Sequence, residues 1–421
     1  MLQGDRVKDR MQNSQFSPLA VLLPVSIGTG LSLVGDSSLY AVLPTHVEDA
    51  GITLASVGIM LSANRFVRLL LNGPAGLAYD RCRRRPLFVG ALLLGALSTA
   101  LYALGGGFWP LFAGRLLWGL SWSGIWVGGN AMIADICDRY TRGRMVGLYQ
   151  TSFFLGTSSG SILGGLLTDW LGYSTAMGIG ASLTLAGALT AFFFLPETFR
   201  PGEDCTVQEE EDRPPVEASG HANGARMASA IALLGVHRLT IPGMLSPTFG
   251  LLLLETFGGS ITMAGMSFGV ATLTGVGLGV SYIVSMVSAP VMGRLSDRAS
   301  DRWRVAAGGL VPGMAGFVLL ALGSPFLILL GLPLAAFAGG SNQGLSAAIV
   351  GDLSREGQRG RKMGILFTVG DLTSAIGPLL AYALIPVVGL KVIYVLSGAV
   401  LAAMMLVAVG WAVHSSGRRA M

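Results

Sequence analysis

The stretch GLAYDRCRRR, residues 76–85, places one aspartate and four arginines in a chain of which only 12% of the residues are charged. GRLSDRASDR, residues 293–302, opens with the same Gly-x-x-x-Asp-Arg pattern, 217 positions later. The pair RGRMVG at 142–147 and RGRKMG at 359–364 keeps the same offset. Because two separate motifs stay in register over this distance, the chain is interpreted as two halves related by an internal repeat.

The composition indicates a polytopic membrane protein. Of the 421 residues, 52% are hydrophobic, the mean hydropathy is +0.64, and 61 residues are glycine, whereas a soluble domain carries about 25% charged residues. Since a spanning helix needs roughly 20 apolar residues, the sequence predicts an all-α membrane protein with twelve transmembrane helices in two six-helix bundles. Their predicted limits are 19–45, 53–78, 87–105, 109–135, 145–168, 175–196, 236–258, 268–291, 305–323, 325–350, 362–385 and 391–413.

The basic residues set the predicted orientation. Arginine and lysine in short loops favour the cytoplasm, and here they gather in the first tail and in the even-numbered loops, with Lys391 alone among the odd-numbered ones. Both termini are therefore expected in the cytoplasm of a multi-pass protein of the plasma (inner) membrane. The predicted units are a tail at 1–18, a bundle at 19–196, a linker at 197–235, a bundle at 236–413 and a tail at 414–421.

The central linker is rich in Glu, Asp, Pro and Gly between residues 196 and 227. Such a composition is typical of a solvated, flexible connector. A regulatory or partner-binding role is the alternative. The net charge of +5 follows from membrane orientation, and no nucleic-acid partner is expected.

At this point the sequence resembles the major facilitator superfamily over nearly its whole length. The stretch from Gly76 to Arg85 looks like the family's signature loop between its second and third helices, with a departure at Cys82, and the second copy is more degenerate. The resemblance implies parallel repeats, alternating access, a small-molecule substrate and a monomer. It assigns gating roles to Gly76, Asp80, Arg81, Arg84, Gly293, Asp297 and Arg298.

The gating assignment has a physical basis. A carboxylate at a helix end can lie against the N-terminus of a neighbouring helix and can pair with arginines. Asp80, Arg81 and Arg84 are thus interpreted as a latch that holds the halves together in the outward-facing state. The alternative is that these charges serve only topology and loop solubility.

Two further motifs carry the resemblance. Arg115-Leu-Leu-Trp-Gly119 resembles the Arg-x-x-x-Gly motif of proton-linked members. The glycines of GTSSGSILGG resemble the exporter-associated motif, although Ser161 stands where that motif has proline. Close helix packing is the alternative for these glycines, which are Gly156, Gly160, Gly164 and Gly165.

Charges inside the predicted helices are functional candidates, because a charged side chain is costly in hydrocarbon. Asp36 lies about 14 Å and Arg115 about 9 Å from the outer end, at 1.5 Å per residue. These depths allow an ion pair or a water-bridged pair. Asp36 is predicted to load and release a proton as the transporter alternates, with Arg115 tuning it; a permanent structural ion pair is the alternative.

The remaining charged candidates are assigned to a substrate cavity. Arg65 and Arg68 share a helix face and could hold an anionic substrate group or a lipid phosphate; the alternative pairs them with an acid inside the helices. Asp371 could be a second proton site, a partner of Arg65 or a substrate contact. Glu255 is either a cavity residue or an acid at the outer rim.

Trp118, Trp122 and Trp126 recur every four residues. Aromatic faces bind apolar or cationic compounds, so Trp122, Trp126 and the nearby Asn130 are assigned to the substrate cavity. A lipid-facing or packing stripe is the alternative.

Several functional classes find no support. The sequence contains no P-loop, its four histidines are scattered and suggest no metal site, and no nucleophile–base pattern indicates an enzyme. No cofactor is expected, and a proton gradient is the expected energy source. The predicted function is proton-coupled efflux of small amphipathic compounds, similar to the drug:proton antiporter branch. The alternative is a proton-linked symporter or facilitator of an organic anion or lipid-type substrate.

Overall fold

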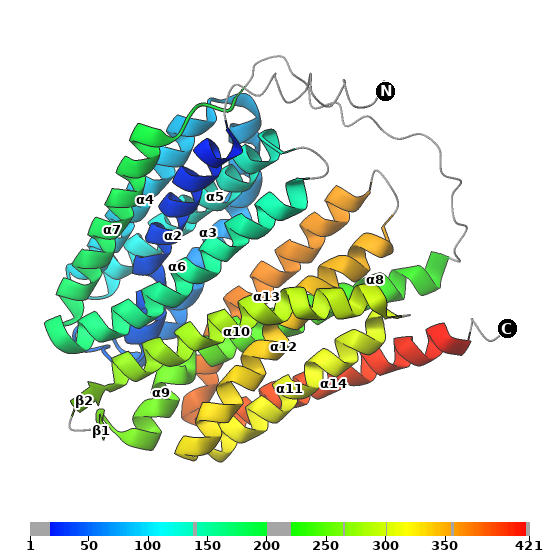
Figure 1. Ribbon diagram of the computed structural model, residues 1–421. Coiled ribbons are helices and arrows are strands. Elements are labelled where there is room, and N and C mark those ends of the chain that lie inside the picture. Colours follow the sequence, from blue (N-terminus) through cyan, green and yellow to red (C-terminus); the bar gives the residue numbers. More distant parts are fainter. Residues whose placement is uncertain are drawn as a thin grey trace.

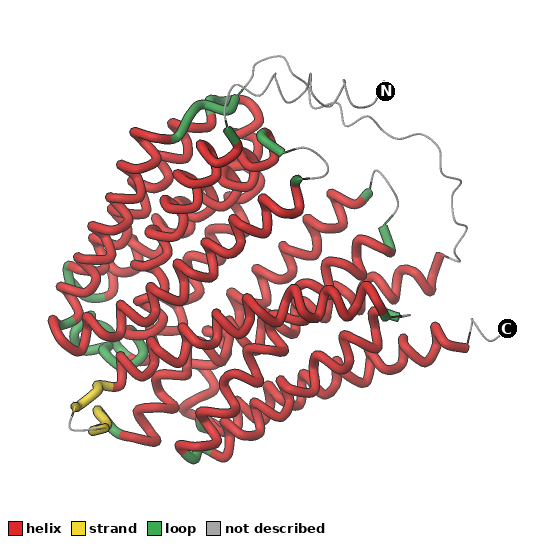
Figure 2. The backbone as a smooth tube through the Cα atoms, viewed as in Figure 1, coloured by secondary structure: helices red, strands yellow, loops and turns green. Residues whose placement is uncertain are grey.

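The computed structural model describes residues 17–137, 141–199, 220–263, 266–299, 301–354 and 358–417. Most of the predicted tail at 1–18, residues 200–219 of the predicted linker and the end of the predicted tail at 414–421 lie outside these ranges. Helices make up most of the described chain, and a pair of short strands lies at one end (Figure 2).

The first half consists of α2 (Pro18–Val42), α3 (Leu54–Arg81), α4 (Arg84–Ala103), α5 (Phe108–Asp135), α6 (Arg142–Leu171) and α7 (Tyr173–Phe194). The second half consists of α8 (Gly220–Arg238), the π-helical segment η1 (Leu239–Leu245), α9 (Ser246–Phe257), β1 (Ser260–Met263), β2 (Met266–Gly269), α10 (Val270–Arg298), α11 (Arg302–Leu322), α12 (Pro325–Asp352), α13 (Arg359–Val388) and α14 (Leu390–Gly417). Figure 1 shows α2–α7 and α8–α14 as two bundles lying side by side.

One predicted boundary is wrong. The helix expected at 236–258 is the last part of a continuous helical rod, α8–η1–α9, which begins at Gly220, 16 residues earlier and inside the predicted linker. The stretch from 220 to 235 is rich in alanine, which favours helix. Its glycine, asparagine and arginine residues lower the hydropathy, so an apolarity criterion starts the helix too late.

Two prolines explain the π-helical segment. Pro242 and Pro247 have no backbone N–H, so the i→i−4 ladder of an α-helix cannot continue through them. The chain widens over η1, and the N–H of Ser246 donates to the carbonyl of Ile241, five residues back. This wide turn lies in the middle of the α8–η1–α9 rod.

The strands form a small antiparallel hairpin between α9 and α10, with Ser260 opposite Gly269. The sequence did not predict it. We call this end of the molecule the hairpin end, and we call the opposite end, where α3 ends at Arg81 and α10 ends at Arg298, the arginine-loop end (Figure 1).

The two halves contact each other at the hairpin end. A Cβ atom added to Gly165 of α6 would collide with the carbonyl of Ala271 of α10, and one added to Gly275 would collide with the carbonyl of Ser161. The Asp169 carboxylate also accepts from the backbone N–H of Thr272 across the halves, at 2.8 Å. The helices α6 and α10 therefore touch along this end.

The same two helices separate toward the arginine-loop end. Gly147 lies on the same face of α6 as Gly165, five turns away at 3.6 residues per turn. Gly293 lies on the same face of α10 as Gly275, also five turns away. Among the described residues, a Cβ at either position would meet nothing within 4 Å. The halves are joined at the hairpin end and apart at the arginine-loop end.

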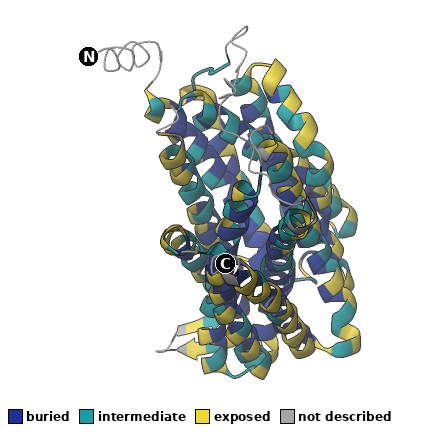
Figure 3. Ribbon diagram, turned by 90° about the vertical axis from the view of Figure 1, so that its right-hand side faces the viewer, coloured by how far each residue is buried: buried dark blue, intermediate teal, exposed yellow. Residues whose placement is uncertain are grey.

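The outer surface suits a lipid environment. Large apolar side chains are strongly exposed on it, among them Leu70, Phe194, Leu329 and Val387, each more than two-thirds exposed. Figure 3 shows buried residues toward the interior of the bundles and exposed ones on the outside. Within the described residues, ten helical segments are long and apolar enough to cross a membrane. They include the rod from Asn223 to Phe257 but not α5 or α6.

Candidate functional site

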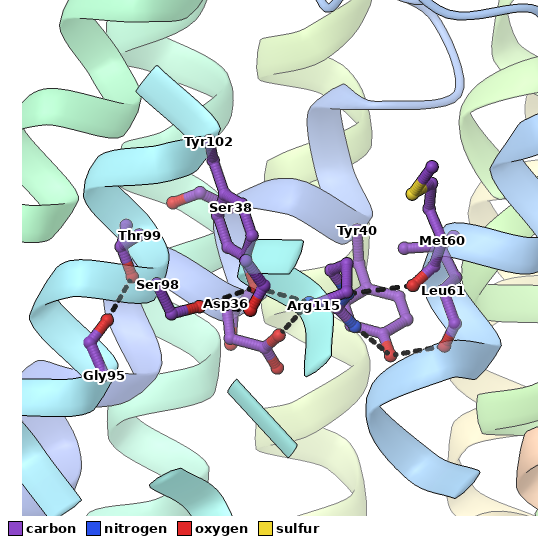
Figure 4. Close-up of polar contacts among 12 residues, drawn as sticks. Asp36, Ser38, Tyr40, Met60, Leu61, Gly95, Ser98, Thr99, Tyr102 and Arg115 are labelled. Atoms are coloured by element: carbon purple, nitrogen blue, oxygen red, sulfur yellow. Dashed lines mark hydrogen bonds and ion pairs between the residues drawn. The ribbon is translucent and has the colours of Figure 1, made fainter. Parts of the chain in front are cut away.

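Asp36 of α2 and Arg115 of α5 form a direct ion pair, which is one of the two arrangements that their depths allowed. Arg115 Nη1 lies 2.5 Å from Asp36 Oδ1 (Figure 4). The Arg115 side chain is fully buried, whereas the Asp36 side chain is 14% exposed. The carboxylate is therefore the member of the pair that solvent can reach.

Two tyrosines and a backbone carbonyl complete the surroundings of Arg115. Its Nε donates to the Met60 carbonyl at 2.8 Å, and its terminal nitrogens donate to the hydroxyls of Tyr102 and Tyr40, both at 3.4 Å (Figure 4). The guanidinium also lies over both rings, 5.6 Å from the Tyr40 centroid and 5.8 Å from that of Tyr102. Sequence reasoning missed both tyrosines, because an uncharged side chain gives no signal in an argument based on buried charge.

The glycines of the two motifs allow close helix approach. A Cβ at Gly119 would crowd the Asn64 carbonyl at 2.6 Å, so this glycine lets α5 lie against α3 and brings Arg115 within reach of Met60. On α6, Gly156, Gly160 and Gly164 lie against α2. Gly165 lies against α10 of the other half. The packing interpretation is thus confirmed, and a transport role for the α6 glycines stays a prediction.

Arg65 joins the halves by binding carbonyl groups that prolines leave free. Its Nη1 donates to the Ser374 carbonyl of α13. In a regular helix this carbonyl would accept from the N–H of residue 378, but residue 378 is proline and has none. Its Nη2 donates to the Pro242 carbonyl at 3.1 Å. In the i→i+5 register of η1 the partner of that carbonyl would be residue 247, which is also proline. Arg65 thus satisfies two backbone acceptors in the second half.

Asp371 pairs with Arg68, one helical turn from Arg65. Arg68 Nη2 lies 3.0 Å and 3.2 Å from the two carboxylate oxygens, with the side chains 20% and 15% exposed. A third arginine, Arg238 at the end of α8, interacts electrostatically with Asp371, Arg68 and Arg65. Sequence reasoning missed Arg238, because it lay two residues inside the predicted start of its helix and looked like a boundary residue.

Tyr40 connects the ion pair of the first half with this group of charges. The Arg65 guanidinium lies 5.3 Å from the centroid of the Tyr40 ring that also contacts Arg115. Tyr282 of α10 interacts electrostatically with Tyr40, Arg65 and Asp36. A continuous polar layer therefore runs from Asp36 across the contact between the halves to Asp371.

The other predicted cavity residues lie apart from this layer. Trp118, Trp122 and Trp126 stack as a ladder in the first bundle, with centroids 6.0 Å and 5.6 Å apart, and Trp122 is only 5% exposed. Trp126 and Asn130 are half-buried, and the Asn130 amide donates to the Trp126 carbonyl. Glu255 is exposed on α9 near the hairpin end, as its rim interpretation predicted.

The arginine loops form ion pairs inside each half. Arg84 pairs with Asp135 between α4 and α5, and Arg302 pairs with Asp352 between α11 and α12, at 2.6 Å. The two aspartates are equivalent in the repeat, since 217 positions separate them. Arg302 also pairs with Asp297 at 2.9 Å.

The other predicted gating residues are open to solvent. Asp80, Arg81 and Arg298 are exposed. The ion pairs that Arg84 and Arg302 form with described residues stay within their own halves. Gly76 and Gly293 meet nothing described within 4 Å of an added Cβ. The latch that the sequence assigned to these loops therefore stays a prediction. The described residues include no cluster of histidine, cysteine or acidic side chains that could hold a metal ion.

Comparison with known proteins gives a consistent result. The profile of the Major Facilitator Superfamily matches residues 25–281 and 240–419. The class C tetracycline resistance protein of Escherichia coli is 28% identical over 382 residues, covering 86% of this chain and 89% of that protein. A Multidrug resistance protein MdtG from Salmonella choleraesuis is 27% identical over 278 residues, covering 65% of each.

Solved structures share the fold. A bacterial homolog of the human lysosomal transporter Spinster, in an inward-facing conformation, aligns with a TM-score of 0.72 at 14% identity, covering 92% of this chain and 94% of that one. The human organic anion transporter MFSD10 aligns with a TM-score of 0.64 at 21% identity, covering 94% of this chain and all of that one. At these identities the likeness concerns the fold.

Proposed function

The chain belongs to the Major Facilitator Superfamily, and from this premise we propose that it exports small amphipathic compounds in exchange for protons. Secondary transport is the activity that its relatives and structural neighbours support. The resistance proteins among those relatives support the outward direction and the broad class of compound. The proton gradient supplies the energy in this proposal, without a cofactor, and the working unit is a monomer.

The proposed topology has twelve spans with both termini in the cytoplasm, in the plasma (inner) membrane. Ten apolar helical segments support it. α5 and α6, at 28 and 30 residues, have room for a span of about 30 Å at 1.5 Å per residue. The arginine-loop end then faces the cytoplasm, and the conformation described above is the inward-open one.

The Asp36–Arg115 ion pair is the observation that supports proton coupling. Arg115 is fully buried and Asp36 is partly exposed, so a proton from solvent reaches the carboxylate. Protonation removes the counter-charge of Arg115, which is costly in a buried site. The arginine then relies more on its tyrosine contacts, and Tyr40 is shared with Arg65.

This arrangement links protonation to the contact between the halves. Arg65 is bound to carbonyl groups of η1 and α13, so a shift of Tyr40 alters a contact that holds the hairpin end closed. In our proposal, proton binding at Asp36 changes the stability of the inward-open state relative to the outward-open one. A ligand moves such an equilibrium only through its different affinity for the two states.

Reconstitution tests the proposal. The purified protein would be placed in liposomes with a trapped pH dye, and tetracycline, tetraphenylphosphonium and 2-naphthoate would be supplied in turn. We expect at least one probe to drive protons in the opposite direction to its own movement, and Asp36→Asn to abolish this proton movement. Asp49→Asn, at an exposed carboxylate near the hairpin end, is the matched control and should behave like the wild type.

The second candidate is a proton-linked symporter or facilitator of an organic anion or lipid-type substrate. The arginines of the polar layer favour it, because their charge suits an anionic group. The same liposome measurement separates the candidates by direction. Protons moving together with 2-naphthoate would support symport and would contradict the export proposal, as would unchanged proton coupling in Asp36→Asn.

A further inference from the structure

The middle of the molecule carries more positive than negative charge. Arg68 pairs with the carboxylate of Asp371, and Arg65 lies one helical turn from Arg68 on α3. Arg238 of α8 packs beside Gly370, the residue before Asp371. Arg68 donates to that carboxylate, whereas within the described chain the hydrogen bonds of Arg65 go to backbone carbonyls and its guanidinium lies over the Tyr40 ring. Among the described residues Arg238 forms no ion pair, although all three guanidiniums lie in one electrostatic group. Within the described chain, two of these three arginines therefore have no carboxylate of their own to pair with.

Burial makes this imbalance costly. Arg65 is only 7% exposed. The Nε atoms of Arg68 and Arg238 are buried, and within the described chain neither has a hydrogen-bond acceptor. Buried charges in proteins are normally paired, and buried donors normally find an acceptor. The group is therefore incomplete without an anion that carries acceptor oxygens.

The group also lies where a ligand could arrive. Along α3 and α13 the halves touch at Gly58 beside Tyr382 and again at Arg68 beside Asp371. Beyond that level a Cβ at Gly73 of α3, or at Gly364 of α13, would meet nothing described within 4 Å. The arginines thus lie at the level where the halves part, on the side of the arginine-loop end.

We propose that Arg65, Arg68 and Arg238 bind an oxyanion, and that this is the carboxylate or phosphate group of the transported amphipathic compound. A guanidinium suits either oxyanion because its N–H donors lie in one plane and can donate two parallel hydrogen bonds. The link to transport rests on the function proposed above, whereas the binding site itself does not.

Asp371 makes the site sensitive to the contact between the halves. A ligand oxyanion competes with its carboxylate for Arg68, and Arg68 and Arg65 supply polar contacts that tie α3 to α13. Binding therefore weakens the tie that keeps the hairpin end closed. The compound would promote its own passage to the outward-open state.

Matched ligands test the site on the purified protein in a neutral detergent. The probes are 2-naphthoate and 2-naphthyl phosphate, with neutral 2-naphthol and the cation 2-naphthylmethylammonium as controls of the same ring. Binding is read by thermal stabilisation and by calorimetry. We expect only the two anions to bind, with affinity reduced at least tenfold in Arg238→Gln and in Arg68→Gln.

Two further variants keep the test decisive if an arginine variant fails to fold. Asp371→Asn removes the competing carboxylate and should tighten anion binding several-fold. Arg226→Gln changes another arginine of α8, which lies over Trp411 away from the group, and should leave binding unchanged. The proposal would be overturned if the affinity for the anions were unchanged in both Arg238→Gln and Asp371→Asn, or if the cation bound more tightly than the anions.

A parallel measurement with a lipid shows whether the bound oxyanion comes from a membrane lipid or from a transported compound. Phosphatidylglycerol is added to the same detergent, and its stabilisation is compared in wild type and Arg238→Gln. If the lipid stabilises through Arg238 and the naphthyl anions do not, the assignment to a transported compound is wrong. If the anions bind as expected but none of the liposome probes drives proton movement, the transport proposal fails while the oxyanion site stands.

Discussion

Arg115 shows how one side chain organises a site within a bundle of apolar helices. Its Nε contacts the Met60 carbonyl, one terminal nitrogen contacts Asp36, and two tyrosine rings lie against its faces. A planar fork with several donors can meet these partners at once, whereas a lysine ammonium cannot. The chemistry of the residue, and not only its charge, fixes its place.

The variant Arg115→Lys tests this interpretation. It keeps the charge but loses the contact with the Met60 carbonyl and the ring stacking, so we expect the free energy of unfolding to fall by roughly 2 kcal/mol. The measurement is unfolding in mixed detergent micelles. Arg294→Lys, at an exposed position of α10, serves as the control. Equal stability of the two variants would mean that charge alone places Arg115.

For individual residues, the sequence predicted a contact only where the position of a residue along its helix and its charge were enough to identify the partner. The depths of Asp36 and Arg115 in their helices predicted the ion pair that the structure forms. Arg238 was missed since the start of its helix was predicted too late, and the proline-freed carbonyl partners of Arg65 were missed because they depend on helix rotation. The rotation of each helix about its axis is set by packing between helices. These helices show no regular polar face, so the sequence alone does not reveal that rotation.

Among the secondary-structure elements, prolines create the acceptors that hold the halves together. Pro378 leaves the Ser374 carbonyl of α13 without its helical partner, and the prolines around η1 do the same for the Pro242 carbonyl. An irregular helix is thus used to provide polar groups in an apolar environment. The π-helical segment η1 was not predicted from the sequence.

A double-mutant cycle measures this coupling. In Pro378→Ala the Ser374 carbonyl regains a backbone N–H partner, so Arg65→Ala should cost roughly 1 kcal/mol less in that background than in the wild type. The free energies of unfolding of the four proteins provide the coupling energy. Pro290→Ala, at a proline inside α10, should show no coupling with Arg65→Ala. Additive effects of Arg65→Ala and Pro378→Ala would contradict the freed-carbonyl explanation.

The glycines of α6 allow a second test at the scale of the helix. Gly165→Val forces a side chain against the Ala271 carbonyl and should destabilise the protein by about 1–3 kcal/mol. Gly147→Val lies five turns away on the same face, where no described atom is close, and should be neutral or slightly stabilising because valine favours helix over glycine. Thermal unfolding compares the two, and equal losses would contradict the separation of α6 and α10 at the arginine-loop end.

For the whole molecule, the internal repeat predicted the architecture better than the conformation. The offset of 217 residues anticipated two similar bundles, and the equivalent pairs at Asp135 and Asp352 follow it. The repeat could not indicate which end of the molecule is closed, because both conformations use the same two bundles. Only contacts between the halves, such as Gly165 against Ala271, decide that.

Cysteine cross-linking tests the closed end. A Cβ at Gly250 lies 3.2 Å from Thr45 Cγ2 of the other half, so Thr45→Cys with Gly250→Cys should form a disulfide, in a background with the native cysteines replaced by serine. If the alignment of α6 with α10 is extended toward the arginine-loop end, Gly147 lies opposite Ala289. The pair Gly147→Cys with Ala289→Cys lies where the helices are apart and should not cross-link. Gel mobility with and without reductant measures both. Efficient linking of the second pair alone would mean that the arginine-loop end is the closed one.

The stacked indoles of α5 give the protein an optical signature. Trp118, Trp122 and Trp126 lie with nearly parallel rings, 25° and 18° between successive planes. The strong far-ultraviolet transitions of indoles this close couple, so we expect an exciton couplet in the circular dichroism of the protein. Trp303 and Trp411 of the second half are tilted by 36° and lie 6.4 Å apart. Melting of the first bundle can therefore be followed by light alone, without a label, and separately from that of the second.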